Sequence, residues 1–195
     1  LASLKLRPAS QQGGRSGPVG RAGRTRSHVR SRYGNMIPIV AITMDKMLFQ
    51  ENISFRELGS YKIGGPVRYF ATPKTEEELR EVIQFKKEKD LPVFILGGGT
   101  NILMNDNGFQ GLIIKPFFSF IKRNENQLRV GAGVLMSDLL VYAIQNNLGG
   151  LEWAWGLPGT VGGAVRGNAG CFGSETKDNI QNVESINLET GEKVI

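Results

Sequence analysis

The sequence predicts an α+β fold, and three observations lead to this prediction. Short apolar runs bounded by turn residues recur along the chain, as at 92–96 and 111–115, which is typical of strands. Two amphipathic stretches with helical spacing lie among these runs. With 195 residues, 40% of them hydrophobic and 22% charged, the chain is long enough to bury a core, and it has no apolar run of membrane-spanning length.

The first recognisable unit is strand, helix, strand. Residues 67–72 (VRYFAT) form a candidate strand. Thr75 and Glu78 then have the spacing of a helix capping box, and three acidic residues occupy the first helical turn, where the helix dipole favours negative charge. Residues 92–96 (PVFIL) follow as a continuously apolar strand, which predicts burial on both faces. The unit therefore predicts a parallel pair of strands.

Further elements follow in order. Residues 111–115 (GLIIK) and 127–130 (QLRV) are candidate strands. Ser137 is predicted to cap the start of a helix over 138–147, and Gly149 and Gly150 are predicted to end it. The final stretch, 183–195, alternates around a Glu-Thr-Gly-Glu turn and predicts a β-hairpin whose second strand begins as the sequence stops.

The beginning of the chain has a different composition. Residues 1–35 hold eight Lys or Arg, no acidic residue, and many Gly and Ser. We therefore predict a disordered tail over 1–47 and interpret it as foreign to the natural protein, with a transit peptide and a nucleic-acid-binding arm as alternatives. Removing those eight from the 24 basic residues leaves 16 against 18 acidic ones, a net charge of −2 for 36–195. A nucleic-acid-binding protein is the less favoured class for that reason.

Few residues of the chain suit metal binding or nucleophilic catalysis. Cys171 is the only cysteine, which excludes an intramolecular disulfide and a cysteine-based metal site. The only histidine, His28, lies in the tail, so histidine-based catalysis is not expected in the folded part. We predict no metal site and interpret Cys171 as a small packed residue.

Two glycine-rich segments carry the chemical signal. One is Gly97–Gly99 followed by Thr100 and Asn101; the other is 156–173 (GLPGTVGGAVRGNAGCFG), with seven glycines. Such turns either pack tightly against a neighbouring strand or present backbone N–H groups to an anion, commonly phosphate. A dinucleotide fingerprint starting at Gly97 fails at Ile102, and no P-loop motif is present. The residues alone therefore indicate a nucleotide-type cofactor.

Three stretches then show a family resemblance: 60–66 (SYKIGGP), 96–115 (LGGGTNILMNDNGFQGLIIK) and 156–173, in this order. The chain resembles the UDP-N-acetylenolpyruvoylglucosamine reductases of bacterial peptidoglycan synthesis, also called UDP-N-acetylmuramate dehydrogenases, over roughly residues 50–195. The first stretch is shared in part with other flavoproteins of the vanillyl-alcohol-oxidase type. The resemblance implies a cytoplasmic bacterial protein with a two-lobed, PCMH-type FAD-binding domain over 48–195, and FAD held non-covalently between the lobes.

The resemblance also implies which residues touch FAD. The first glycine segment would wrap the diphosphate, the second would line the opposite wall, and a glycine turn near 131–133 would close around the cofactor. The loop at 63–65 would lie near the flavin. The implied FAD-binding residues are Ile63, Gly64, Gly97, Gly98, Gly99, Thr100, Asn101, Gly131, Gly133, Gly156, Pro158, Gly159, Thr160, Gly162, Gly163, Ala164, Asn168 and Gly170.

The implied reaction is the NADPH-dependent reduction of UDP-N-acetylglucosamine enolpyruvate to UDP-N-acetylmuramate, with FAD carrying the hydride between NADPH and the UDP-sugar. The family's catalytic arginine, serine and glutamate belong to segments expected beyond Ile195, as does its substrate-binding domain. Arg166 does not match the catalytic arginine. We therefore assign no catalytic residue, treat the FAD domain as C-terminally truncated, and predict that these 195 residues alone are inactive and retain FAD weakly.

Two alternatives remain open from the sequence. One is another FAD-dependent oxidase or dehydrogenase of the same superfamily, which a different C-terminal domain would define. The other is a non-catalytic protein that binds nucleic acid through residues 1–35. The expected partners of the reductase are its UDP-sugar substrate and NADPH, with no membrane.

Overall fold

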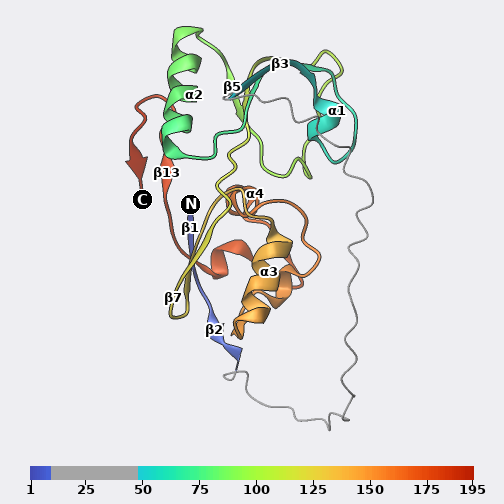
Figure 1. Ribbon diagram of the computed structural model, residues 1–195. Coiled ribbons are helices and arrows are strands. Elements are labelled where there is room, and N and C mark those ends of the chain that lie inside the picture. Colours follow the sequence, from blue (N-terminus) through green and yellow to red (C-terminus); the bar gives the residue numbers. More distant parts are fainter. Residues whose placement is uncertain (10–47) are drawn as a thin grey trace, which may run out of the picture. The chain divides into compact units, whose positions relative to one another are not determined.

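The computed structural model describes residues 1–9 and 48–195, which belong to one structural unit (Figure 1). Two four-stranded sheets organise this unit, and helices pack on both of them. The predicted α+β class is therefore confirmed.

The first sheet contains, in spatial order, β3 (Phe49–Ser54), β4 (Pro66–Ala71), β6 (Phe109–Ile114) and β5 (Val93–Ile95). β3 is antiparallel to β4, whereas β4, β6 and β5 run parallel. The predicted strand directions are right, but β4 and β5 are not neighbours because β6 lies between them. β5 is an edge strand, and the prediction that it is buried on both faces is wrong, since Ile95 is 46% exposed.

Helices cover both faces of this sheet. α2 (Glu76–Glu88) packs on one face and the short α1 (Phe55–Leu58) on the other (Figure 1). Because side chains alternate along a strand, Leu112 and Ile114 of β6 join the core under α2, whereas Ile113 joins the core under α1. Both faces of the sheet are therefore covered by packed side chains.

The start of α2 largely follows the predicted capping box. Thr75 Oγ1 accepts a hydrogen bond from the Glu78 N–H at 3.2 Å, as predicted. The Glu78 carboxylate, however, accepts from the Lys74 N–H at 2.7 Å, one residue earlier than the capping residue itself. Both bonds satisfy backbone groups that the first helical turn would otherwise leave unpaired.

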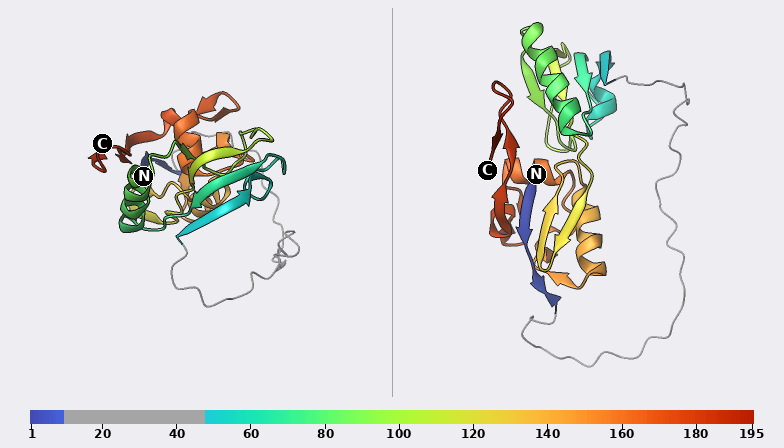
Figure 2. Two further views of the ribbon diagram at one scale, coloured as in Figure 1. Left: turned by 90° about the horizontal axis from the view of Figure 1, so that it is seen from above. Right: turned by 60° about the vertical axis from the view of Figure 1, so that its left-hand side comes forward.

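The second sheet contains β12 (Ile180–Val183), β1 (Ala2–Lys5), β8 (Gln127–Val130) and β7 (Ile121–Asn124), with every neighbouring pair antiparallel. Figure 2 shows β1 running beside the β7 and β8 hairpin. The buried residues of this sheet pack against α3 (Met136–Gln145) and α4 (Val161–Gly167), which complete a separate core.

Strand β1 corrects the predicted disorder over 1–47. Ala2, Leu4 and Leu6 are each at most 3% exposed and alternate with Ser3, Lys5 and Arg7, which is the period of a half-buried strand. The arginines and glycines farther along the tail dominated its average composition and hid this alternation. The prediction is therefore wrong for residues 1–9, and residues 10–47, including His28, lie outside the described residues.

The predicted helix over 138–147 is present as α3, but its predicted cap is wrong. The helix begins at Met136, with Leu135 at the capping position and Ser137 inside the first turn. The Met136 N–H donates to the Gly159 carbonyl at 3.0 Å, so a tertiary contact replaces the side-chain cap. α4 (Val161–Gly167) was not predicted, because three of its seven residues are glycines.

The remaining elements are short. The C-terminal hairpin predicted for 183–195 is confirmed, and the Asn187 side chain accepts from two N–H groups within its turn. The short elements are β2 (Arg7–Pro8), β9 (Leu148–Gly149), η2 (Glu152–Ala154), β10 (Gly170–Cys171), β11 (Ser174–Glu175), η3 (Thr176–Asp178), β13 (Ser185–Ile186) and β14 (Lys193–Val194).

An ion pair spans strand β1. The Arg129 guanidinium on β8 makes two hydrogen bonds to Glu184, which follows β12, at 3.0 and 2.7 Å. This bidentate contact lowers the pKa of the Glu184 carboxyl, chiefly through the hydrogen bonds from Arg129. The pair therefore contributes stability above the ordinary pKa of a glutamate and loses it as the pH falls through the lowered value.

Strand β1 gives the fold a direct test. Replacing Leu4 by Ala should lower the free energy of unfolding by about 2–5 kcal/mol, because it leaves a cavity in the core of the second sheet. The exposed Leu103, at 73% exposure, is the matched control, and Leu103→Ala should change stability by less than about 0.5 kcal/mol. Urea unfolding followed by circular dichroism measures both. Equal midpoints for the two variants would contradict the placement of β1.

Candidate functional site

The two glycine-rich segments pack directly against each other. A Cβ atom on Gly98 would lie 2.7 Å from the Gly159 Cα, and one on Gly97 would lie 3.3 Å from the Gly163 Cα. Real Cβ atoms do not tolerate the first of these distances, so the two backbones can meet only where side chains are absent. Tight packing, one of the two roles open from the sequence, is therefore a property of this site.

The second segment is fixed on its far side by α3 and α4. Gly159 has φ +102°, a conformation that favours glycine, and its carbonyl accepts from Met136. Thr160 is buried and caps α4, accepting from the Gly163 N–H at 3.3 Å. Ala164 lies buried in the same helix. These contacts hold the segment in one conformation before any ligand binds.

The first segment also contacts the loop that contains SYKIGGP. The Ser60 N–H donates to the Gly99 carbonyl at 2.9 Å, and a Cβ on Gly99 would lie 2.6 Å from the Leu58 carbonyl oxygen. In the same loop Gly64 has φ +112° and packs against Met104, whereas Ile63 is half exposed. The structure therefore brings together all three sequence stretches that carry the family resemblance.

The first segment leaves its backbone donors free. Within residues 1–9 and 48–195, the N–H groups of Gly97 through Asn101 donate no hydrogen bond to the protein. Gly99 is nevertheless a buried residue, and a buried N–H without a partner is unfavourable. Five consecutive donors in a bend are suited to an anion, so this segment fits the diphosphate of FAD.

A third glycine turn lies beside the second segment. Gly131 and Gly133 could not carry side chains, because their Cβ atoms would lie 1.9 Å from the Phe118 carbonyl oxygen and 2.9 Å from the Phe118 nitrogen. The Gly162 N–H donates to the Ala132 carbonyl at 2.9 Å, which joins this turn to the start of α4. These two glycines therefore shape the backbone next to Phe118.

A cavity of about 630 Å³ opens where these turns meet the ends of the strands. Of the residues implied by the sequence resemblance, only Gly162 lines it. Its apolar wall comes from residues that were not predicted: Leu1, Ala2, Leu79, Ile95, Ile114, Pro116, Phe118, Phe120, Ala132, Val161, Val165, Val183, Ile186 and Leu188. The volume suits a nucleotide-sized ligand. Ile95 lies two residues before the glycines, and Phe118 and Phe120 belong to an unusual PFFSF run. The sequence therefore held a signal for these cavity-lining residues.

The cavity wall carries more unpaired cations than anions. Its two acidic residues are both paired: Glu184 with Arg129, and Glu76 with Lys193 at 2.7 Å. The remaining charged wall residues are Lys74, Lys122 and Arg166, none of which has an ion-pair partner among the described residues. An anionic nucleotide would therefore be attracted to this cavity.

Several of the residues that the family resemblance implies for FAD binding lie outside the cavity and instead stabilise the local backbone. Asn168 is the left-handed cap of α4, and its side-chain amide donates to Glu175 at 2.6 Å and accepts from the Lys177 N–H. Gly170 lies in β10 and would contact Ser174 if it had a side chain. Gly156 has φ +80° with open space around it, and Pro158 is exposed.

Thr100 and Asn101 take different places in the first segment. Thr100 Oγ1 would lie 3.0 Å from a Cβ on Gly159, so it packs at the contact of the two glycine segments. Asn101 is exposed. Cys171 is half-buried in β10.

Among residues 1–9 and 48–195, no group of three His, Cys, Asp or Glu side chains is placed to hold a metal ion. Within the same ranges, no helix is both long and apolar enough to cross a membrane.

Comparisons with known proteins point to one family. Residues 67–195 match the family described as FAD binding domain. The chain is 40% identical to a UDP-N-acetylenolpyruvoylglucosamine reductase of Treponema denticola over 166 residues, and 38% identical to the enzyme of the same name from Orientia tsutsugamushi over 144 residues. These alignments cover 80% and 71% of this chain, but 51% and 47% of the relatives. The chain thus spans about half the length of the curated relatives it matches.

A solved structure agrees. The crystal structure of the UDP-N-acetylenolpyruvylglucosamine reductase from Thermus caldophilus matches with a TM-score of 0.61 and 31% sequence identity. The match covers 73% of this chain and 50% of that one.

The glycine contact gives the site a matched test. Gly98→Ala should lower the free energy of unfolding by about 1–3 kcal/mol, because the new methyl group would press on the Gly159 backbone. Gly167 ends α4 with open space around it, so Gly167→Ala should be neutral or stabilise by about 0.5–1 kcal/mol. Urea midpoints of the two variants measure the difference. A neutral Gly98→Ala would show that the two segments are not in contact.

Proposed function

The chain belongs to the FAD binding domain family, and from that premise we propose that it forms the cofactor-binding half of a UDP-N-acetylenolpyruvoylglucosamine reductase. The proposed whole reaction is the NADPH-dependent reduction of the enolpyruvyl group of the UDP-sugar to UDP-N-acetylmuramate, in cytoplasmic peptidoglycan precursor synthesis. The observation that carries the proposal is that the second glycine segment packs on both the 131–133 turn and the first segment, whose N–H donors are free, and that a nucleotide-sized cavity lies beside these turns.

In this proposal each part of the site has one task. The N–H groups of Gly97–Asn101 bind the diphosphate, because they are free, consecutive and partly shielded from water. The cavity beside Ile95 and Phe118 takes an apolar or aromatic part of the ligand. The turns at 131–133 and 159–163 position the cavity walls and need not contact the ligand through side chains.

The bound FAD supplies the hydride-transfer chemistry. The residues of this chain bind and orient it and exclude water from part of it. No described residue is proposed as the proton donor to the substrate. FAD attachment is proposed to be non-covalent, since Cys171 lies in the short β10 strand outside the cavity lining.

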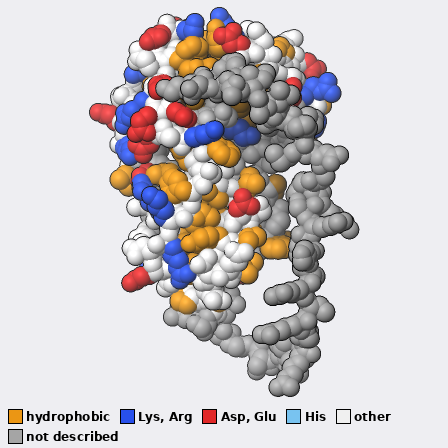
Figure 3. All heavy atoms as spheres, in the orientation of Figure 1, with side chains coloured by type: hydrophobic (Ala, Val, Ile, Leu, Met, Phe, Trp, Pro, Cys, Tyr) orange, Lys and Arg blue, Asp and Glu red, His pale blue; other side chains and the backbone are white. Residues whose placement is uncertain are grey.

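The nucleic-acid alternative finds no support in the described residues. Lys5 and Arg7, two of the eight basic residues on which it rested, lie in β1 and β2, and the other six lie outside the described residues. Figure 3 shows Lys, Arg, Asp and Glu side chains intermixed on the face in view. A basic stripe of the kind that tracks a phosphate backbone is not visible on that face.

Flavin titration tests the proposed cofactor. The 195-residue chain should bind FAD and release it intact on denaturation, as measured by flavin fluorescence. It should bind riboflavin much more weakly, because riboflavin lacks the diphosphate that the free N–H groups are proposed to hold. Equal affinity for the two flavins, or no binding of FAD at millimolar concentration, would overturn the cofactor assignment.

A fusion tests the proposed reaction separately. The chain alone should show no substrate-dependent oxidation of NADPH. Joining it to the part of the Treponema denticola reductase that this chain does not match should give oxidation that depends on the enolpyruvyl UDP-sugar. A fusion that retains FAD yet ignores this substrate would leave the cofactor assignment intact and refute the reductase.

A further inference from the structure

We infer that Lys115 and Lys62 form a cationic pair that binds the diphosphate of the cofactor from the α1 side of the first sheet. The inference rests on the proposed function and adds two binding residues to the glycine segment. Neither lysine belongs to the set implied by the sequence resemblance.

Lys115 lies next to the glycine segment because of strand register. It directly follows β6, whose last residue, Ile114, is paired with Ala71 of β4 and with Ile95 of β5. The Lys115 N–H donates to the Ala71 carbonyl, and the Leu96 N–H donates to the Ile114 carbonyl, both at 2.8 Å. The carboxyl ends of three parallel strands therefore meet here, where anionic ligands commonly bind in such sheets.

The alternation of β6 decides which face Lys115 occupies. Ile113 packs in the core under α1, whereas Ile114 packs under α2 and lines the cavity. Lys115 is two residues after Ile113 and therefore extends on the α1 side, opposite the cavity. Lys115 does not line the cavity, which agrees with this placement.

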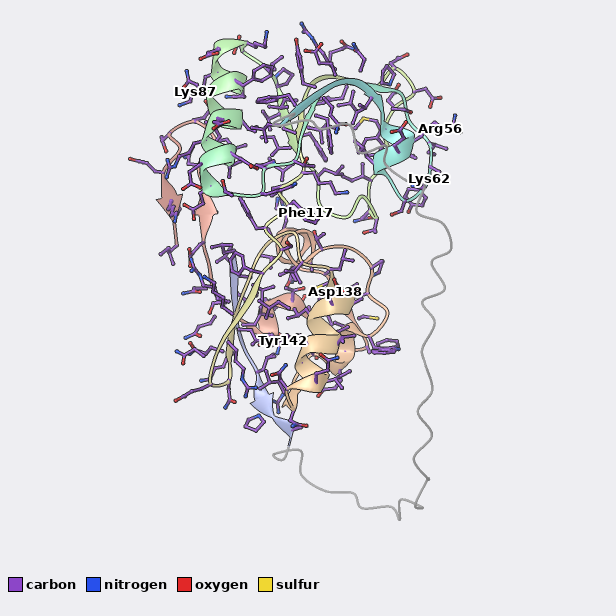
Figure 4. All side chains as sticks on the ribbon, in the orientation of Figure 1. Arg56, Lys62, Lys87, Phe117, Asp138 and Tyr142 are labelled. Atoms are coloured by element: carbon purple, nitrogen blue, oxygen red, sulfur yellow. The ribbon has the colours of Figure 1, made fainter. Side chains whose placement is uncertain are left out.

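Lys62 approaches from the loop that follows α1, where Figure 4 shows it beside Arg56. Its backbone has φ +58°, an uncommon conformation for a long side chain, and it is held by hydrogen bonds to Gly59 and from Arg56, each of 3.3 Å. The bond from Ser60 to Gly99 fixes this loop against the glycine segment. These hydrogen bonds fix the turn that carries the exposed Lys62 side chain.

The two ammonium groups lack a compensating anion. In the described part of the chain, neither side chain makes an ion pair or a hydrogen bond. Burial lowers the pKa of Lys115, and the positive charge of Lys62 lowers it further. The charged form of a half-buried lysine beside another cation is unfavourable in the ligand-free protein. A bound anion would offset both the burial and the repulsion between the two lysines.

A diphosphate is the anion that the surroundings favour. The glycine segment connects the two sides, because Ile95, two residues before it, lines the cavity, and Gly99 accepts a hydrogen bond from Ser60 in the loop that carries Lys62. One extended ligand could therefore place an aromatic end in the cavity, its diphosphate on the glycine segment, and its charge against the lysines. The N–H groups supply direction and the lysines supply net positive charge.

The test compares Lys115→Met with Lys87→Met. Lys87 is an exposed lysine on α2, and Figure 4 places it on the other side of the sheet from Lys62. Both changes remove one positive charge. Lys115→Met should weaken binding of FAD and of ADP by about 10- to 100-fold, whereas Lys87→Met should leave both affinities unchanged. Binding of Lys115→Met should also depend less on salt concentration.

Stability separates a binding role from a structural one. Because Lys115→Met removes an unfavourable charge, its urea midpoint without ligand should equal or exceed that of the wild type, while Lys115→Arg should keep most of the affinity. Unchanged affinity for FAD and ADP in Lys115→Met overturns the inference but not the proposed function. A loss of affinity for FAD alone would also overturn it, since the charge would then act on the flavin ring. Failure of the wild type to bind either ligand would overturn both.

Discussion

The site depends on a contact between two backbones. Gly98 meets Gly159 at a distance that excludes even a methyl group, and this contact joins the end of the first sheet to the start of α4. Contacts this close are made by dispersion forces between main-chain atoms and cannot be relaxed by rotating a side chain. The Gly98–Gly159 contact therefore fixes how closely the two glycine segments can approach each other.

This constraint explains why close packing and free N–H donors occur together in one short segment. Gly97 and Gly98 use their missing side chains to admit a neighbouring backbone, and the same stretch turns its N–H groups away from any protein partner. Side chains at these positions would prevent the close backbone contact and would also displace the N–H donors. Rigidity and free donors arise from the same residues, so the proposed anion site needs little rearrangement to bind its ligand.

The local sequence pattern predicted the helices and strands better than it predicted which of them are buried or paired. The β8 strand, the Thr75 cap and the final hairpin follow from short-range chemistry and were found where expected. Burial of β5 and the disorder of residues 1–9 were wrong, because both depend on partners far away in the sequence: β6 between β4 and β5, and β8 beside β1. The glycines that make the close backbone contacts were singled out from the sequence, and their binding of FAD stays a prediction. The cavity wall was not, since Ile95, Phe118 and Arg166 are ordinary residues until the fold places them together.

Strand β1 has a consequence for how the protein forms. Leu4 pairs with Leu128, 124 residues later, and Leu4 pairs on its other side with Ile180. At ordinary rates of synthesis the first strand must wait roughly 6–25 s before its nearer partner leaves the ribosome. During that interval its apolar residues and unpaired edges are available to chaperones or to other nascent chains. The second sheet is accordingly a late and slow event in folding, because contacts of such long sequence separation are costly to close.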